Sequence, residues 1–197
     1  VRTRAGCIDA DDIMGHSWHV TVRVRAFLAC SVDGFIAGLN DELDWLDGYD
    51  EAADTFTPFF ADIGAMLMGR RTFDVVSGLD GPWPYGDTPV LVATTRPLEP
   101  KCATVAAVGG SIGEMVARAK EVAGDKDVYL DGGKLIRSAL GAGLIDEITI
   151  TVVPVILGAG VPLFAGGEGR HELELARTRE IGSGLVELVY RRVTASS

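Results

Sequence analysis

Short apolar runs that stop abruptly at polar or glycine residues recur along the chain, and most are followed by a stretch with helical spacing. The run Val22–Cys30 starts with strand alternation and ends apolar, which is typical of a strand that enters the middle of a sheet. Ser111 and Glu114 have the spacing of a capping box, which marks the start of a helix. By these patterns we expect further strands at Ala65–Met68, Val90–Thr94, Val128–Leu130 and Ile145–Val153, and helices at Asp50–Asp62, Arg71–Ser77, Ser111–Ala123 and Lys134–Leu140.

Strand and helix patterns alternate through most of the chain, and the last part differs from the rest. There, two alternating runs flank Gly182-Ser183-Gly184, which predicts a β-hairpin. Alternation followed by a hairpin predicts a three-layer α/β/α sandwich with a mostly parallel sheet and a C-terminal antiparallel hairpin. We expect residues 21–195 to form a single domain, and residues 1–20, which lack a clear period, to form an N-terminal arm.

The net charge and the cysteine count narrow the possible functions. The 197 residues carry a net charge of −10, which argues against nucleic acid as a partner but leaves room for one small cationic pocket. Cys7, Cys30 and Cys102 are widely spaced, and His16 and His19 have no further ligand at a suitable spacing, so we expect neither a disulfide framework nor a metal site. No apolar run reaches the ~18 residues of a membrane span, and no signal peptide is expected, so we expect a cytoplasmic protein without a membrane partner.

Three of the expected strands lead into similar polar or glycine turns: "MLMGRRT" with Arg70 and Arg71, "VLVATTR" with Arg96, and "VYLDGGK" with Lys134. The carboxyl ends of parallel strands meet at one edge of a sheet, where ligands bind. Helix N-termini offer free N–H groups there, glycine permits close approach of the backbone, and arginine presents donors that fit phosphate. Each turn alone is typical of a solvated surface, but together the three favour a ligand with more than one phosphate. Their spacing matches neither GxGxxG nor GxxxxGK[ST].

The same turns carry a resemblance to a known family. "MGRRTF", "ATTRP" and "YLDGGKLIRSALGAGLIDEITITVVPVILGAGVPLF" together resemble the dihydrofolate-reductase-like superfamily. Within it, the long last segment is most similar to the reductase domain of the bifunctional riboflavin-biosynthesis deaminase-reductase. "CSVDGFIAG" resembles the Ser-x-Asp-Gly turn of that family, and the similarity extends over residues 22–193.

The resemblance implies a homodimeric reductase that uses NADPH to reduce 5-amino-6-(5-phosphoribosylamino)uracil. It assigns to the cofactor the GR-x-T turn, the turn after the next strand, the Gly-Gly turn and positions beside the nicotinamide. In this sequence these residues are Ala29, Ile36, Gly69, Arg70, Arg71, Thr72, Thr94, Thr95, Arg96, Leu130, Gly132, Gly133, Lys134 and Leu135.

Catalytic and substrate-binding residues are less clearly marked. The Asp of the Ser-x-Asp-Gly turn makes Asp33 a candidate proton donor, although Asp-Gly is also a common turn pair. Trp45 could stack on a flat substrate or cover a hydrophobic patch. In folate reductases a carboxylate precedes the MGR segment, and Asp54 lies near that position but is shifted from it.

Two departures from the family pattern affect the expected substrate. The zinc-deaminase motifs H-x-E and P-C-x-x-C are absent, so the resemblance is to the reductase half alone. The stretch "LNDELDWLDGYDEAADTF" is strongly acidic where the riboflavin enzymes would be expected to carry basic or hydroxyl residues for a ribose phosphate. A folate- or pterin-type reductase and a non-catalytic NADPH-binding protein therefore remain alternatives.

Overall fold

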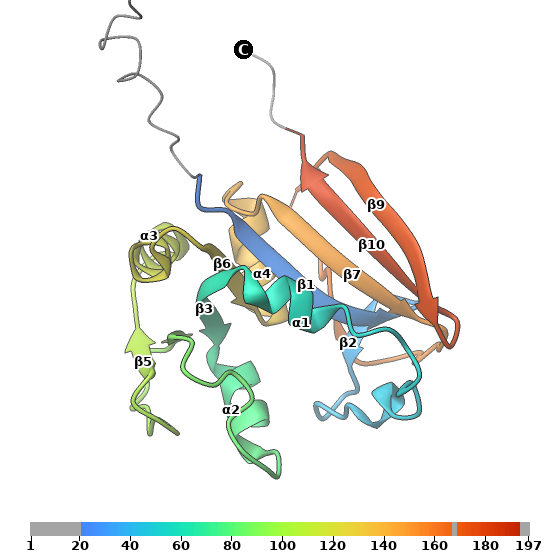
Figure 1. The fold of residues 1–197 in the computed structure, drawn as a ribbon, viewed down its shortest axis with the longest axis horizontal. Helices are drawn as coiled ribbons and strands as arrows, with labels where there is room; N and C mark the ends of the chain where they lie inside the picture. Colours follow the sequence, from blue (N-terminus) through green and yellow to red (C-terminus); the bar gives the residue numbers. More distant parts are fainter. Residues whose placement is uncertain (1–20, 167–168, 194–197) are drawn as a thin grey trace, which may run out of the picture.

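An eight-stranded sheet with helices on both faces forms the centre of the structure, a computed structural model that describes residues 21–166 and 169–193 (Figure 1). Residues 1–20, including His16 and His19, lie outside the described residues. In chain order the elements are β1 (Val24–Ser31), β2 (Phe35–Ala37), the 3₁₀ turn η2 (Asp44–Leu46), α1 (Phe56–Ala61), β3 (Ile63–Gly69), α2 (Arg70–Gly78), β4 (Val90–Ala93), β5 (Val105–Val108), α3 (Ile112–Ala123), β6 (Asp127–Asp131), α4 (Gly133–Gly141), β7 (Glu147–Val153), β8 (Val161–Pro162), β9 (Leu173–Gly182) and β10 (Leu185–Arg192).

The strands follow the order β5-β4-β3-β6-β1-β7-β10-β9 across the sheet. The first six run parallel to one another, and β10 joins β7 in antiparallel register before pairing with β9. This arrangement confirms the predicted mostly parallel sheet with a C-terminal antiparallel hairpin. Because the parallel strands share one direction, the carboxyl ends of β1, β3, β4 and β6 lie at the same edge.

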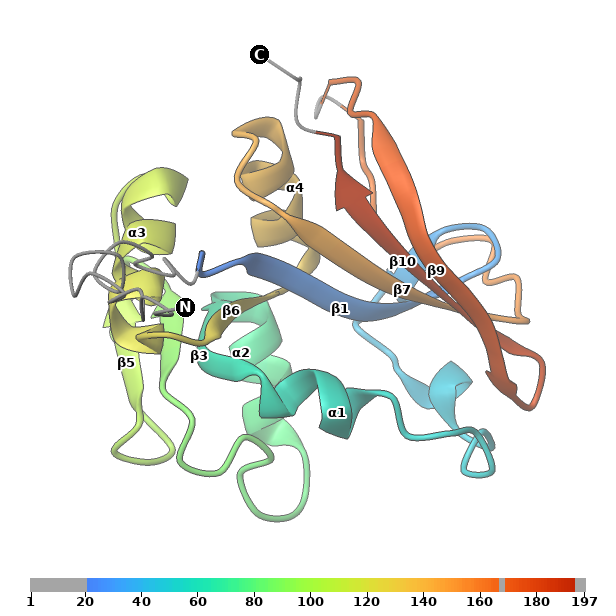
Figure 2. The same cartoon turned by 45° about the horizontal axis from the view of Figure 1, so that its top comes forward.

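Helices cover the two faces of the sheet in pairs, which gives the three predicted layers (Figure 2). On one face, α3 and α4 pack through residues such as Ala119 and Ile136 against the aliphatic side chains of β1 and β6. On the other face, α1 and α2 pack through Phe59 and Phe73 against Met66, Met68 and other β3, β4 and β6 side chains. The capping box at Ser111 and Glu114 is present at the start of α3.

Three local predictions were incomplete or wrong. The helix expected at Asp50–Asp62 covers only Phe56–Ala61, because the Asp54 carboxylate accepts hydrogen bonds from the Phe56 and Thr57 amides, each 3.0 Å, at the helix start. Strand β5 was not predicted, since it lies at the edge of the sheet and only Val105 of its four residues is buried, whereas the equally short β4 is buried along most of its length. The small β2–β8 sheet was not predicted either, because strands of three and two residues show no period.

Arg25, near the amino end of β1, has a structural role. Arg25 is 9% exposed and donates to Glu147 at 2.8 Å and to Asp127 at 3.3 Å. Its guanidinium also lies 4.6 Å from the centre of the Phe59 ring. Buried cations need paired carboxylates, and these two supply them. Within the described part of the chain, no helix is long and apolar enough to cross a membrane.

Candidate functional site

A groove of about 1090 Å³ runs along the carboxyl ends of β1, β3, β4 and β6. Thirteen of the fourteen residues assigned to the cofactor from sequence line this groove; the exception is Leu130, which is fully buried in the core. The thirteen are Ala29, Ile36, Gly69, Arg70, Arg71, Thr72, Thr94, Thr95, Arg96, Gly132, Gly133, Lys134 and Leu135.

Helices α2 and α4 both begin at the groove with backbone N–H groups that no side chain caps. Their N-cap residues are Gly69 and Gly132, which have no capping side chain. The first turn of α2 contains Arg70 and Arg71 rather than an acid, although the helix dipole favours an acid there. Open amides combined with cations are a suitable arrangement for phosphate.

The carboxylate of Asp74 joins Arg70 and Arg96, which come from different turns. Asp74 accepts from Arg70 Nε at 2.7 Å and from an Arg96 terminal nitrogen at 3.4 Å. Arg70 also donates to the carbonyl of Pro97 at 2.7 Å. Thr94 accepts from the Arg96 amide at 3.0 Å and shapes the turn after β4. These contacts bring the guanidinium groups of two separate turns to one place.

Arg71 is paired with an acid from the loop after β2 rather than with Asp74. Its Nε donates to the Asp41 carboxylate at 2.7 Å, and both residues line the groove. Asp41 lies in the loop after β2 and has a φ of +68°, a conformation that is uncommon for residues other than glycine. This ion pair therefore links α2 to the loop that precedes η2.

The Gly132-Gly133 turn requires glycine for two reasons. Gly132 has a φ of +105°, and a Cβ there would lie 2.6 Å from Thr72 Oγ1. A Cβ on Gly133 would lie 2.7 Å from Ile36 Cδ1. The turns after β3 and β6 and strand β2 thus meet more closely than any side chain at these positions would permit.

Aromatic side chains line the groove near β1. Phe27 and Phe56 contact each other edge to face with ring centroids 5.4 Å apart, and the Phe56 and Tyr129 centroids are 6.1 Å apart. The Tyr129 hydroxyl donates to the Phe27 carbonyl at 2.9 Å, so its polar atom is already engaged. Leu43 and Leu46 line the groove as well. We call these five residues, together with Asp131, the aromatic end.

Asp131 is the candidate functional residue that the sequence analysis did not select. It is the last residue of β6, lines the groove and follows Tyr129 on the same face of the strand. Burial raises the pKa of Asp131 to about 6, and the Gly132 amide opposes this shift in part. Burial and then the nearby Asp131 carboxylate raise the pKa of Tyr129. The sequence signal for Asp131 was its position directly before the Gly132-Gly133 turn.

The basic end of the groove is formed by other elements. We define it as the groove-lining residues of α2, of the turn after β4 and of the first turn of α4 that carry cations or hydroxyls. They are Arg70, Arg71, Thr72, Thr94, Thr95, Arg96 and Lys134.

The structure places Asp33 outside the groove lining and engages its carboxylate in a turn. Asp33 accepts from the Ser31 hydroxyl at 2.7 Å and from the amides of Leu157 and Gly158 at 3.1 and 2.7 Å. The Ser31 hydrogen bond, followed by the two amides, holds the pKa of Asp33 below its usual range. A carboxyl that stays ionised is poorly suited to donate a proton.

The two residues expected to contact substrate also lie elsewhere. Trp45 packs beside Val153, Ile181 and Leu185, which agrees with its alternative interpretation as the cover of a hydrophobic patch. Asp54 is exposed and bonds the start of α1. Neither residue lines the groove.

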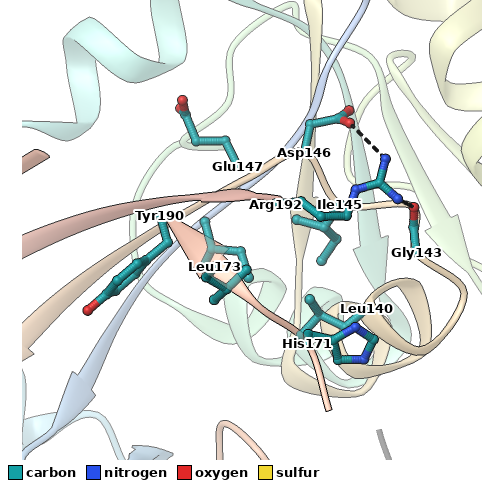
Figure 3. Close-up of a pocket in the computed structure, with 10 residues that line it drawn as sticks. Leu140, Gly143, Ile145, Asp146, Glu147, His171, Leu173, Tyr190 and Arg192 are labelled. Carbon is teal, nitrogen blue, oxygen red and sulfur yellow. Dashed lines mark hydrogen bonds and ion pairs between the residues drawn. The ribbon is translucent and has the colours of Figure 1, made fainter. Parts of the chain in front are cut away.

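A second cavity, of about 10 Å³, lies between the end of α4 and strands β7 and β10 (Figure 3). Its wall includes Arg192, which donates to the Gly143 carbonyl and lies 3.9 Å from Asp146. A space of this size holds no more than about one water molecule, so the groove is the better candidate for a functional site.

Comparison with known proteins agrees with this architecture. The chain is 31% identical over 167 residues to the uncharacterized protein YwjB of Bacillus subtilis strain 168, covering 84% of this chain and 95% of YwjB. A crystal structure from Shewanella sp. PV-4, of a protein named for riboflavin biosynthesis, superposes with a TM-score of 0.80 at 31% identity, covering 88% of this chain and all of that chain.

A more distant structure shares the fold. Dihydrofolate reductase from Enterococcus faecalis, complexed with NADP(H), superposes with a TM-score of 0.60 at 13% identity, covering 86% of this chain and 96% of that chain. The sequence profile of the RibD C-terminal domain matches residues 22–187. The chain therefore belongs to the RibD C-terminal domain family, with a dihydrofolate-reductase-like fold.

Proposed function

We propose that this protein is an NADPH-dependent reductase whose basic end binds the cofactor and whose aromatic end binds a small-molecule substrate. The observation that carries the proposal is the convergence of two uncapped helix starts with Arg70, Arg71 and Arg96 at one sheet edge. The donors suit the anionic groups of NADPH, because open amides fit a pyrophosphate and guanidinium groups fit a terminal phosphate. The family membership supports a reductase.

The chain's own residues would bind and orient the cofactor and the substrate, and one of them would protonate the substrate. NADPH supplies a hydride when bound, and the protein must provide a proton for the reduced substrate atom. Asp131 lines the groove at the aromatic end, and its pKa of about 6 leaves a usable protonated fraction near neutral pH. Phe27 and Phe56 would hold a flat substrate and exclude water. We assign the proton-donor role to Asp131 instead of Asp33.

The family resemblance names 5-amino-6-(5-phosphoribosylamino)uracil as the first substrate to test. It also leads us to expect a cytoplasmic homodimer, and sedimentation of the purified chain would test the dimer. A folate- or pterin-type reductase and a non-catalytic NADPH-binding protein are the alternatives. A non-catalytic protein would bind NADPH but would not oxidise it in the presence of any substrate tested, whereas a pterin-type reductase would oxidise it with a pterin.

A thermal-shift titration with NADPH and NADH side by side tests the proposal. A ligand present at about 100 times its Kd stabilises the native state by about 2.7 kcal/mol, which shifts the Tm of a domain this size by several degrees. We expect such a shift with NADPH and a much smaller one with NADH at equal concentration. Absence of a shift with both nucleotides would overturn the cofactor assignment and the reductase proposal with it.

A further inference from the structure

The segment that builds most of the aromatic end has an unusual charge. Between Arg25 and Arg70 the sequence contains no Lys, Arg or His, whereas residues 41–54 alone contain seven acids. This segment includes the end of β1, β2, η2 and α1, and it contributes Phe27, Leu43 and Phe56 to the groove. A negative surface of this kind repels a phosphate and favours a neutral or cationic ligand.

The cations that line the groove come from other elements, and the arginines among them are already engaged in ion pairs or hydrogen bonds. Lys134, in the first turn of α4, belongs to the basic end. Arg70 and Arg96 share the carboxylate of Asp74, a residue of α2. Arg71, which reaches toward the acidic segment, is paired there with Asp41 at 2.7 Å. Arg137 donates to the carbonyls of Pro162 and Leu163 at 2.8 and 3.2 Å. All of these cations lie outside the segment between Arg25 and Arg70 or at its end, and the six residues that define the aromatic end include no cation.

Asp131 is the charged group that the aromatic end does offer. In the part of the chain that the structure describes, no ion pair reaches its carboxylate, although it is partly buried beside Tyr129. A partly buried carboxyl without a cation is best matched by N–H donors at the edge of a ligand. The neighbouring rings of Phe27 and Phe56 suit the faces of a flat ligand.

We infer that the substrate of this reductase is a flat heterocycle with ring N–H donors and no phosphate group, held through Asp131 and the rings of Phe27 and Phe56. This inference rests on the proposed reductase function and narrows its substrate. It departs from the phosphoribosyl compound that the family resemblance implies.

A matched pair of ligands tests the inference. NADP⁺ is first titrated into the protein, and the loaded protein is then titrated with 5-amino-6-(5-phosphoribosylamino)uracil or with the same compound lacking its phosphate. We expect the compound without phosphate to bind about tenfold or more tightly than its partner, because repulsion by the acidic segment acts on the phosphate alone. Asp131→Asn should weaken that binding about tenfold, while Asp125→Asn, an exposed acid in the turn before β6, should not.

Several results would overturn the inference. Equal or tighter binding of the phosphorylated compound would show that a cation does serve the substrate, and loss of that binding in Arg71→Ala would identify it. Binding of neither compound, or no effect of Asp131→Asn, would also contradict it. Failure of the NADP⁺ titration would instead contradict the proposed function, so the two failures are distinguishable.

Discussion

The two ends of the groove share one sheet edge but are built with opposite chemistry. At the basic end, α2 and α4 start at glycines without side-chain caps and with cations in the first turn. At the aromatic end, Phe27, Phe56 and Tyr129 line the groove together with the carboxyl of Asp131, whose pKa is raised by burial. A polyanionic cofactor and a substrate without phosphate would have these two sets of requirements, and this contrast is the basis on which we propose the basic end for the cofactor and the aromatic end for the substrate.

Helix α3 differs from α2 and α4 because side chains cap its first amides. There, the Glu114 carboxylate accepts from the Ser111 amide at 2.8 Å, and the Glu114 amide in turn donates to the Ser111 hydroxyl at 3.3 Å. This capping box satisfies amides that α2 and α4 leave open, although the start of α3 also borders the groove. The same fold therefore closes one helix start and keeps two available for anions.

The largest effect should come from removing the titratable group of the aromatic end. Asp131→Asn keeps the shape of the side chain but loses the proton, so turnover should fall about 100-fold, within the range of general acid catalysis. NADPH binding should change little, because the substitution leaves the basic end intact. Steady-state NADPH oxidation measures the first effect and nucleotide titration the second. Unchanged turnover would contradict the assignment of Asp131 as proton donor.

The junction between the two ends should tolerate no side chain. Gly132→Ala combines a φ of +105° with a Cβ 2.6 Å from Thr72 Oγ1, and it should lower the free energy of unfolding by about 2–4 kcal/mol. Gly124 has a φ of +65° but nothing within 4 Å of its Cβ, so Gly124→Ala isolates the backbone cost of about 1 kcal/mol. Urea denaturation of both variants measures the difference. Equal losses would show that the close approach at Thr72 is unimportant.

The raised pKa of Asp131 should make Asp131→Asn stabilising, and more so at higher pH. A carboxyl with a folded pKa of about 6 instead of 3.8 binds its proton more tightly in the native state, so its contribution to stability declines as pH rises from about 4 through 6. The advantage of Asp131→Asn over the parent should therefore grow across this window to about 3 kcal/mol and stay constant above it.

Thermal unfolding of both proteins from pH 4 to pH 8 measures this prediction. The groups that face Asp131, including Tyr85, Tyr129 and the Gly132 amide, are the same in both proteins. The carboxyls with lowered pKa, such as Asp33 and Asp54, are also common to both and cancel in the difference. A difference that does not vary with pH would contradict the raised pKa.

The smallest expected effect concerns the ion pair between Arg71 of α2 and Asp41 of the loop after β2. Asp41 competes with a phosphate for Arg71, so Asp41→Asn should tighten NADPH binding about two- to fivefold, as expected for an exposed pair worth under about 1 kcal/mol. The effect should disappear in the Asp41→Asn/Arg71→Ala double variant. Weaker NADPH binding in Asp41→Asn would show instead that the pair holds the loop in a favourable position.

The basic end was predictable from sequence because its signals are local. A buried run, a sharp turn and an arginine or glycine lie within a few residues of one another at Gly69–Thr72 and Gly132–Lys134, and parallel strand order brings such turns together. The strand and helix alternation identified the three layers for the same reason. Strands β2 and β8 carry too few residues for a pattern, and the edge strand β5 is mostly exposed, with alanines at its middle positions, and therefore lacks the run of large apolar residues that marked β4.

The aromatic end was not predictable in this way, because its composition depends on contacts between distant segments. Asp33 resembled a catalytic acid in sequence, but the amides of Leu157 and Gly158 engage it from more than a hundred residues away. Asp131 is a candidate because Phe27 and Phe56 line the same groove, and both lie more than 70 residues from it in the sequence. No local pattern distinguishes an acid that bonds a turn from one left without an ion-pair partner.

Titration calorimetry with NADPH and NADH, on the parent protein and on Arg70→Ala, tests the division of the groove most directly. Loss of charge-assisted hydrogen bonds to a phosphate costs about 1.5–3 kcal/mol, so Arg70→Ala should weaken NADPH binding roughly 10- to 100-fold and leave NADH binding nearly unchanged. Arg118→Ala, at an exposed position on α3, serves as the control and should alter neither. Equal weakening of both nucleotides by Arg70→Ala, or tighter binding of NADH than NADPH by the parent protein, would contradict a basic end built for NADPH.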